Sequence, residues 1–459
     1  MIPKDLKQYS SYFTEYTELR AQENKSNRIA IINGDIVTNI KQKTSGISAR
    51  VNKDGYWGFA SNPLLEENEI QNVIERATGN AFFLSGKGRK KDIILPVRNG
   101  NLGNDFSTQN FLKPQSEIIE FLMKLDEYIE TNCKDLSSRV IALQTLDMEK
   151  TLLTSEGSTS YSLTPKSLIY IGMTITKDGA PIVLWDNFGG FGQFEDVFKH
   201  PEGLFAGIDA QYTSLQAKSN GIYAKTGIQE VILDSDITGV LAHEATGHTT
   251  EADLVLGGSV AGDLLNKPVA SELITLVDFA NSAFGKLCPV PVFMDDEGTT
   301  AEDCVIIEAG VLKRFMHNKE TAGLFGHELT GNARASEFSD EPLIRMRNTA
   351  ILPGKSKLEE MIASIDDGYY LIQSNNGEAD FTSEFMFGVV QGYEIKNGKI
   401  GKALRDVTIS GVAVDVLKSV TMVSDYLRWS CWGMCGKKQS IPVGMGGPAI
   451  KCKVNIGGK

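Results

Sequence analysis

The chain of 459 residues is long enough for two or three domains, each large enough to bury its own core. Its 46 Lys and Arg residues are outnumbered by 58 Asp and Glu residues, and the net charge of −12 opposes contact with a nucleic-acid backbone or an anionic membrane surface. Hydrophobic residues make up 41% of the chain, as in ordinary folded proteins, and no apolar run approaches the roughly 18 residues of a membrane span. We therefore expect a cytoplasmic protein that binds neither nucleic acid nor membrane, since the first residues also lack a secretory apolar core.

The first predicted elements are strands joined by tight turns. Asn-Gly at 33–34 and Asp-Gly at 54–55 each separate apolar runs, which is typical of β-hairpins and predicts an antiparallel meander over residues 15–60. Apolar residues then recur every three or four positions over residues 70–81 and again over residues 118–129. This spacing predicts two amphipathic helices.

Further strands are predicted over residues 139–153 and 168–176, where apolar and β-branched residues return. The glycine-rich segment 188–192 lacks the spacing of a phosphate-binding motif and predicts a plain turn. Together these elements predict an N-terminal α+β domain over residues 1–95 and a middle α+β region over residues 96–228.

The pattern changes in the second half of the chain. Residues 231–233 predict a strand, the side-chain oxygens at 234–236 can cap a helix that begins there, and the glycines at 257–258 can end it. Short apolar strands separated by glycines follow. We expect residues 229–459 to form a mainly antiparallel β domain that carries this helix, in a chain whose fold class is α+β.

The predicted helix contains the motif His243-Glu244-Ala245-Thr246-Gly247-His248, which uses two of only five histidines in the chain. Neutral imidazoles bind Zn²⁺, and a neighbouring carboxylate can take a proton from a water molecule that the metal activates, as in His-Glu-x-x-His metallopeptidases. Here the histidines are five positions apart, so they lie about 140° apart around a regular α-helix. We therefore predict a π-bulge or a break around residues 244–248 that brings both imidazoles to one ion.

If both histidines were ordinary metal-free groups of a polar helix, their pairing with Glu244 would be a coincidence, which the small number of histidines makes rare. A catalytic zinc site has three protein ligands and keeps the fourth position for water. The third ligand must come from elsewhere, and the residues able to supply it are His200, His317, His327, Glu251, Asp253 and a cysteine. Cys435 stands out among the cysteines because nearby glycines at 433 and 436 allow the backbone to approach an ion.

Further motifs follow the histidine motif in a fixed order, and they are Asp295-Asp296-Glu297-Gly298-Thr299, Thr330-Gly331-Asn332-Ala333-Arg334, Arg345-Met346-Arg347-Asn348-Thr349, and Cys435-Gly436 with Pro442-Val443-Gly444. Over nearly its full length the chain resembles the TldD/PmbA family, whose members are labelled modulators of DNA gyrase and regarded as zinc metallopeptidases. The motif of two histidines and an acid is typical of the TldD-like branch, whereas TldE (PmbA) paralogues lack it and act as partners.

The resemblance implies that Cys435 is the third ligand, so that His243, His248 and Cys435 hold one Zn²⁺ ion; another divalent metal such as Fe²⁺, Co²⁺ or Mn²⁺ is the alternative. It also implies a dimer, either with a second copy or with a TldE-like paralogue, that admits unfolded peptides to an internal cleft. We predict a peptidase of low sequence specificity in which Glu244 is the general base. The loop after Cys435 is one residue shorter than the family pattern.

Two other functions are compatible with the same residues. The first is a non-catalytic subunit that binds peptides and uses a metal only to stabilise its fold. The second is a metal-dependent hydrolase for a non-peptide amide. Three protein ligands plus water would indicate catalysis, whereas four protein ligands would indicate a structural metal.

Overall fold

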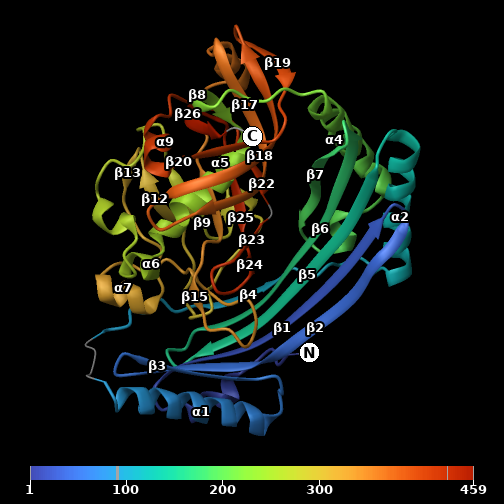
Figure 1. Ribbon diagram of the computed structural model, residues 1–459. Helices are drawn as coiled ribbons and strands as arrows, with labels where there is room; N and C mark the ends of the chain where they lie inside the picture. Colours follow the sequence, from blue (N-terminus) through green and yellow to red (C-terminus); the bar gives the residue numbers. More distant parts are fainter. Residues whose placement is uncertain (1, 89–92, 432, 458–459) are drawn as a thin grey trace.

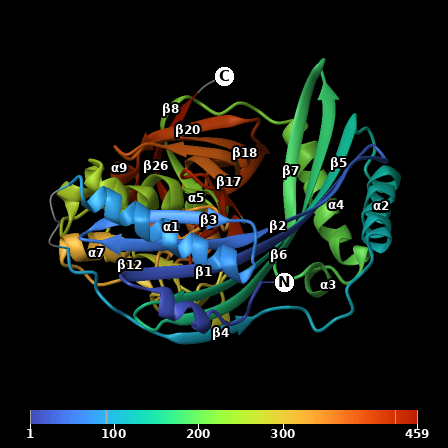
Figure 2. The same cartoon turned by 90° about the horizontal axis from the view of Figure 1, so that it is seen from below.

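The computed structural model describes residues 2–88, 93–431 and 433–457. Its fold class is α+β, as predicted: the first half of the chain builds a long curved sheet, and the second half builds a β-rich body (Figure 1). The body lies on the concave side of the sheet, and the helices of the first half lie on the outer side (Figures 1 and 2).

The curved sheet has seven strands in the order β3-β2-β1-β5-β6-β4, with β7 also paired to β6. Its neighbours are antiparallel except β4 and β6, which are parallel. The predicted meander and the two strands predicted after it are therefore confirmed. The strand bounds are β1 (Tyr16–Ile32), β2 (Asp35–Lys53), β3 (Tyr56–Asn62), β4 (Asn101–Asp105), β5 (Ser138–Thr154), β6 (Thr159–Lys177) and β7 (Ala180–Phe191).

Two tight turns connect the strands of the meander. Asn33 (φ 50°) and Gly34 (φ 90°) are both left-handed, and so are Asp54 (φ 52°) and Gly55 (φ 81°). Two-residue turns with positive φ at both positions match the right-handed twist of the strands that they join. The two hairpins thus form where the dipeptides predict them.

The two faces of the curved sheet have different characters because side chains alternate along each strand. On β1, Leu19 and Ile29 are buried beneath helices on the outer face, whereas Arg20 and Gln22 donate hydrogen bonds to backbone carbonyls of the β-rich body. Both predicted amphipathic helices are confirmed, as α1 and α2. The helix bounds in this half are α1 (Glu67–Ser85), α2 (Gln115–Asn132), α3 (Phe194–Val197) and α4 (Phe205–Ser219).

The turn predicted over residues 188–192 is wrong for most of that segment. Phe188 pairs with Ile169, and the pairing of β7 with β6 continues to Phe191. Gly189 has a φ of +109°, and a Cβ there would lie 2.3 Å from the carbonyl oxygen of Ser167. The glycines therefore permit a close approach between two paired strands, which local sequence patterns do not distinguish from a turn.

Five strands of the second half pair in the order β17-β8-β26-β20-β18. The first and last of them, β17 and β18, also pair with each other, so the five strands form a closed ring. The edge strands β19 and β21 pair with β18 and β26. The bounds are β8 (Gly227–Leu233), β17 (Asp367–Ala379), β18 (Glu384–Lys396), β19 (Lys399–Ala403), β20 (Val407–Val412), β21 (Met422–Val423) and β26 (Ile450–Gly457).

A second, six-stranded sheet of the body has the order β13-β12-β9-β16-β25-β22. Helix α5 (Ser235–Val240) packs against β25, β22 and β17 and so lies between this sheet and the ring. The bounds of the remaining elements are β9 (Leu276–Phe279), β10 (Ser282–Ala283), β11 (Lys286–Leu287), β12 (Cys304–Glu308), β13 (Val311–Leu312), β14 (Ala333–Arg334), β15 (Leu343–Ile344), β16 (Asn348–Ile351), β22 (Arg428–Cys431), β25 (Gly444–Gly447), α7 (Lys319–Phe325), α8 (Leu358–Ala363) and α9 (Ala413–Lys418).

Buried ion pairs join the two halves of the molecule. Glu297 and Asp296, in a turn of the body, contact Arg50 of β2 at 2.5 Å and Lys150 of β5 at 2.6 Å. Removing one partner of such a pair leaves a buried charge without compensation, so the pairs specify how the halves dock. The acidic run at residues 295–297 therefore has a structural role at this interface.

The expected division into residues 1–95, 96–228 and 229–459 stays a prediction. Strands on both sides of residue 95 belong to the one curved sheet, and the ring of the second half begins with β8 at Gly227. Within the described residues, no helix is both long enough and apolar enough to cross a lipid bilayer.

Candidate metal centre

The histidine motif lies on a helical segment whose winding changes three times. Asp234 caps α5 by accepting the N–H of Ser235, and the segment continues as a π-helical turn η3 (Leu241–Gly247), a 3₁₀ turn η4 (His248–Thr250) and helix α6 (Ala252–Leu256). The backbone N–H of His248 donates to the carbonyl of His243, which is the i to i+5 bond of a π-helix. This wider turn brings together side chains that a regular α-helix would separate, so the predicted distortion is confirmed.

Gly247 allows this turn to pack against its neighbours. A Cβ at position 247 would lie 2.1 Å from the sulfur of Met346, which is fully buried. Gly247 itself has helical backbone angles, with φ −60° and ψ −52°. Its small size is therefore required here by packing, and not by an unusual backbone conformation.

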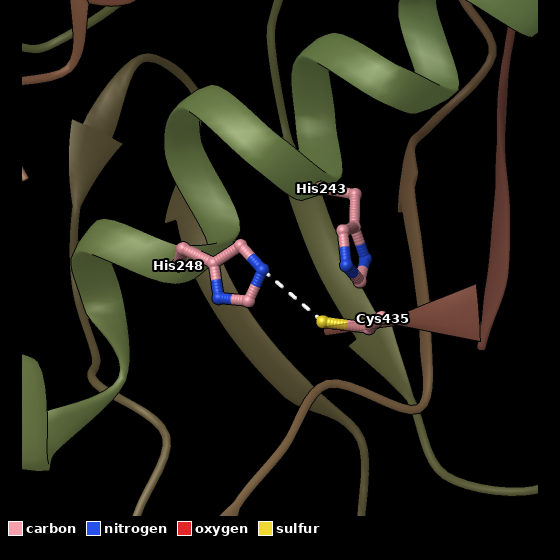
Figure 3. Close-up of side chains that lie close together, drawn as sticks. All are labelled: His243, His248 and Cys435. Carbon is pink, nitrogen blue, oxygen red and sulfur yellow. Dashed lines mark hydrogen bonds between the residues drawn. The ribbon is translucent and has the colours of Figure 1, made fainter. Parts of the chain in front are cut away.

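Three potential metal ligands meet at the π-helical turn: His243, His248 and Cys435 (Figure 3). One ligand atom from each side chain lies within 4.8 Å of the other two. Nε2 of His248 is 3.2 Å from the sulfur of Cys435, although these residues are 187 positions apart in sequence. Cys435 reaches the histidines from strand β23 (Met434–Cys435), which pairs with β24 (Ile441–Pro442).

The surroundings of His243 fit a metal ion. The side chain is fully buried, and neither ring nitrogen has a hydrogen-bond partner among the described residues. A buried imidazole without partners is costly, because it loses the hydrogen bonds that water would provide. Coordination of a cation through one ring nitrogen would compensate for part of that loss, and two imidazoles with a thiolate form a donor set typical of zinc.

The sulfur of Cys435 is in the chemical form that a metal requires. Burial by itself would raise the pKa of this thiol, but the imidazoles of His243 and His248 outweigh burial and lower the pKa to about 4. The residue is therefore a thiolate at neutral pH, and the thiolate is the form of cysteine that binds metals.

Glu251 orients His248 from the side away from Cys435. One carboxylate oxygen of Glu251 lies 2.8 Å from Nδ1 of His248, and the carboxylate is fully buried. Burial opposes ionisation of Glu251, yet His248 and Lys437 together lower its pKa. A carboxylate at Nδ1 holds the proton on that nitrogen, so Nε2 is left to face the sulfur and a metal.

Glu244 lies next to His248, one of the three potential ligands. Its side chain is 25% exposed, and one carboxylate oxygen is 3.5 Å from Nε2 of His248. The carboxylate is thus close to the position of a shared metal ion and still accessible to water. These two properties are what a general base in a hydrolytic metal site needs.

The other candidates for a third ligand lie elsewhere. Nε2 of His317 faces Nδ1 of His327 at 3.1 Å, and both rings pack against Phe315 and Phe325. His200 precedes a 3₁₀ turn of the first half, η2 (Pro201–Leu204). Asp253 pairs with Lys437 instead of joining the cluster. None of these residues belongs to the group of potential ligands found among the described residues.

Two cations hold the site through contacts that the sequence did not predict. Arg345, fully buried, donates to the carbonyl of Cys435 at 2.5 Å and to that of Gln439 at 2.8 Å, so it fixes the loop that carries the thiolate. Lys437 binds Glu251 and Asp253. Their partners are mostly about 90 to 190 positions away, so no local spacing marks these residues.

A groove lined by both polar and apolar side chains borders the loop that carries Cys435. Its cavity of about 410 Å³ lies between the concave face of the curved sheet and the loops of the body, with Met434 and Ser440 in its wall. Ser26, Gln42 and Gln144 line the opposite side. Hydroxyl and amide groups of this kind can hydrogen-bond to a polypeptide backbone regardless of its sequence.

Comparison with known proteins identifies the relatives of this chain. Residues 226–458 match the family model described as the PmbA/TldA metallopeptidase C-terminal domain, and residues 17–81 match the model for PmbA/TldA metallopeptidase domain 1. The chain belongs to the PmbA/TldD family of metallopeptidases. The resemblance noted in the sequence is thereby confirmed.

Members of the PmbA/TldD family resemble this chain over nearly its whole length. A metalloprotease of Methanocaldococcus jannaschii is 32% identical over 444 residues, covering 95% of this chain and 96% of the relative. A zinc metalloprotease TldD homolog of Saccharolobus solfataricus is 31% identical and covers 90% of each chain. The crystal structure of TldE from Thermococcus kodakarensis has the same fold, with a TM-score of 0.75 at 20% identity and coverage of 98% of both chains.

Proposed function

We propose that this PmbA/TldD family member is a zinc-dependent peptidase that hydrolyses unstructured peptides with low sequence specificity. In this proposal His243, His248 and Cys435 hold the ion, and Glu244 is the general base. The observation that carries the proposal is the convergence of the three donor atoms within 4.8 Å beside a partly exposed carboxylate. Three protein ligands leave a coordination position for water, which is the pattern of catalytic zinc sites.

The donor set supports zinc over manganese. Thiolate and imidazole ligands suit zinc, whereas manganese prefers carboxylate and water oxygens. The Saccharolobus solfataricus relative, a zinc metalloprotease TldD homolog, also favours zinc. Iron and cobalt bind similar donors, so elemental analysis of the purified protein is the direct test of metal identity.

The residues of this chain would divide the work of hydrolysis as follows. When bound, a zinc ion would supply Lewis-acid chemistry, which polarises a peptide carbonyl and lowers the pKa of water, so that water can lose a proton and act as a nucleophile near neutral pH. The Glu244 carboxylate accepts a proton from the attacking water and then donates that proton to the leaving amine nitrogen. Glu251 keeps the proton of His248 on Nδ1, so the lone pair of Nε2 remains available to bind the metal.

The groove beside the Cys435 loop supports a polypeptide substrate, because its hydroxyl and amide groups can hydrogen-bond to backbone groups of any sequence. The structural likeness to TldE supports a partnership of the TldD/TldE type, with a homodimer as the alternative. Size measurement of the chain alone and with a TldE-like paralogue would distinguish these assemblies.

The test of this function is the variant Glu244→Gln in the full-length, zinc-loaded protein. Hydrolysis of a reduced and alkylated, permanently unfolded polypeptide should fall about 10²- to 10⁴-fold, while the zinc content stays unchanged. Glu359→Gln, at an exposed position of α8, is the matched control and should keep full activity. Full activity of Glu244→Gln would exclude Glu244 as the base. A wild-type protein that binds zinc and the unfolded polypeptide without cleaving it would favour the non-catalytic subunit.

A further inference from the structure

We propose that Lys437 is a positioning residue for the metal centre, which it serves by holding the Glu251 carboxylate against His248. The inference rests on the metal site of the proposed function and goes beyond it, because it assigns a role to a residue that is neither a ligand nor the general base of that site. In this role Lys437 joins the two chain segments that carry the ligands.

The ammonium group of Lys437 has a complete set of partners. Its Nζ lies 3.1 Å from a carboxylate oxygen of Glu251, 2.7 Å from a carboxylate oxygen of Asp253, and 3.1 Å from the carbonyl oxygen of Ile344. An ammonium has three N–H donors, so all three are used. The side chain is only 11% exposed, which means that these contacts replace most of its hydration.

The Glu251 carboxylate depends on this cation. Its Oε2 atom is shared between Nδ1 of His248 and Nζ of Lys437, and among the described residues its Oε1 atom has no hydrogen-bond partner. A fully buried carboxylate that loses one of its two hydrogen-bond donors is disfavoured, because no water replaces the lost partner. Without Lys437, Glu251 would therefore be drawn towards water, and its hold on His248 would weaken.

The position of Lys437 in the chain makes it a link between the ligands. It lies two residues after Cys435, and Glu251 lies three residues after His248. The ion pair consequently ties the thiolate-bearing loop to the turn that bears the imidazoles. Arg345 holds the same loop through the carbonyls of Cys435 and Lys437, so the loop is fixed on both sides of the glycine at position 436.

The neighbouring Lys438 provides a matched control. It has the same charge and lies one position further along the loop, but it is exposed. A general effect of positive charge near the site would be lost in either variant. An effect through Glu251 would be lost only in variants of Lys437.

The experiment measures zinc affinity of the full-length protein by competition with a chromophoric chelator. Lys437→Met and Glu251→Gln should each weaken zinc binding about 10- to 100-fold, the usual effect of losing a group that orients a ligand. Because Lys437 acts through Glu251, the double variant should bind zinc about as well as Glu251→Gln alone. Lys438→Met should bind zinc as the wild type does. If Lys437→Met does not fold, Lys437→Gln, which can still donate hydrogen bonds, should give an intermediate loss.

Several results would overturn the inference. An unchanged zinc affinity in Lys437→Met, with only a lower melting temperature of the zinc-free protein, would reduce Lys437 to a purely structural role. Losses that multiply in the double variant would place its action on another group. A wild-type protein that binds no divalent metal would overturn the proposed function itself, and this inference with it.

Discussion

Gly247→Ala tests whether the packing of the π-helical turn depends on the absence of a side chain. The added methyl carbon would lie 2.1 Å from the sulfur of Met346 and 3.1 Å from the carbonyl oxygen of Ala242. Ordinary contacts between such atoms are about 3.5–4.0 Å, so one of the groups must move by well over an ångström. Met346 is fully buried, which leaves it little room to do so.

Two effects of Gly247→Ala oppose each other. Because Gly247 has helical backbone angles, alanine gains about 1 kcal/mol of helix propensity. Overpacking of a closed site costs about 1–3 kcal/mol, and the very short distance to Met346 favours the upper part of that range. We therefore expect a net loss of about 1–2 kcal/mol in the free energy of unfolding, together with weaker zinc binding, because the displaced turn carries both histidines.

Chemical denaturation of the metal-free protein measures the loss of stability, and chelator competition measures the zinc affinity. Gly79→Ala is the matched control, since it lies on the exposed face of α1 with no atom within 4 Å of the added Cβ, and it should be neutral or slightly stabilising. Combining Gly247→Ala with Met346→Ala should cost less than the sum of the single changes, because the methyl group then enters the space left by Met346. Wild-type stability and zinc affinity in Gly247→Ala alone would refute this reasoning.

The remaining predictions concern protonation of the site and docking of the two halves. In the metal-free protein, burial lowers the pKa of His248, but Glu251 and Cys435 outweigh it and hold the pKa well above the usual value, while the pKa of Cys435 is about 4. Zinc must then displace a proton from His248 but none from Cys435. Calorimetry in buffers of different ionisation enthalpy should therefore detect the release of about one proton per zinc ion at pH 7. For the same reason, the affinity for zinc should fall as the pH decreases from 8 to 6. Release of about two protons would show that Cys435 is a neutral thiol in the metal-free site. Glu297→Ala removes the closest buried partner of Arg50 and should lower the free energy of unfolding by about 3–5 kcal/mol. Glu302→Ala, the control, removes the more exposed pair with Arg98 and should lower the free energy of unfolding by less than about 1 kcal/mol. Equal losses in these two variants would contradict the assignment of the buried pair to docking.

Much of the first half of the fold follows from short sequence patterns. The Asn-Gly and Asp-Gly hairpins predict their turns because only a few residue types tolerate two successive left-handed positions. The helices α1 and α2 follow from apolar spacing. The spacing of five between His243 and His248 even predicts the π-helical turn, because a shared ion would be impossible on a regular helix.

Patterns of the same kind fail where neighbours distant in sequence decide the conformation. The glycines after Phe188 suggest a turn, but they lie in a strand because β6 approaches them closely. Nothing near Lys437 or Arg345 indicates that the first pairs with Glu251 or that the second binds the carbonyl of Cys435. The closure of the five-stranded ring by β17 and β18 likewise depends on topology and has no local signal.

By itself the sequence determined the elements whose causes lie within a few residues: turns, amphipathic helices, and the acid between two histidines on one widened turn. Only the tertiary structure decided that Cys435 meets those histidines, that Glu251 and Lys437 support them, and that Arg50 and Lys150 receive the acidic run of the body. The physical reason is the separation along the chain over which each interaction acts. Backbone torsions and capping act between neighbours along the chain, whereas metal ligands and buried charges need partners that only the folded topology brings within a few ångströms.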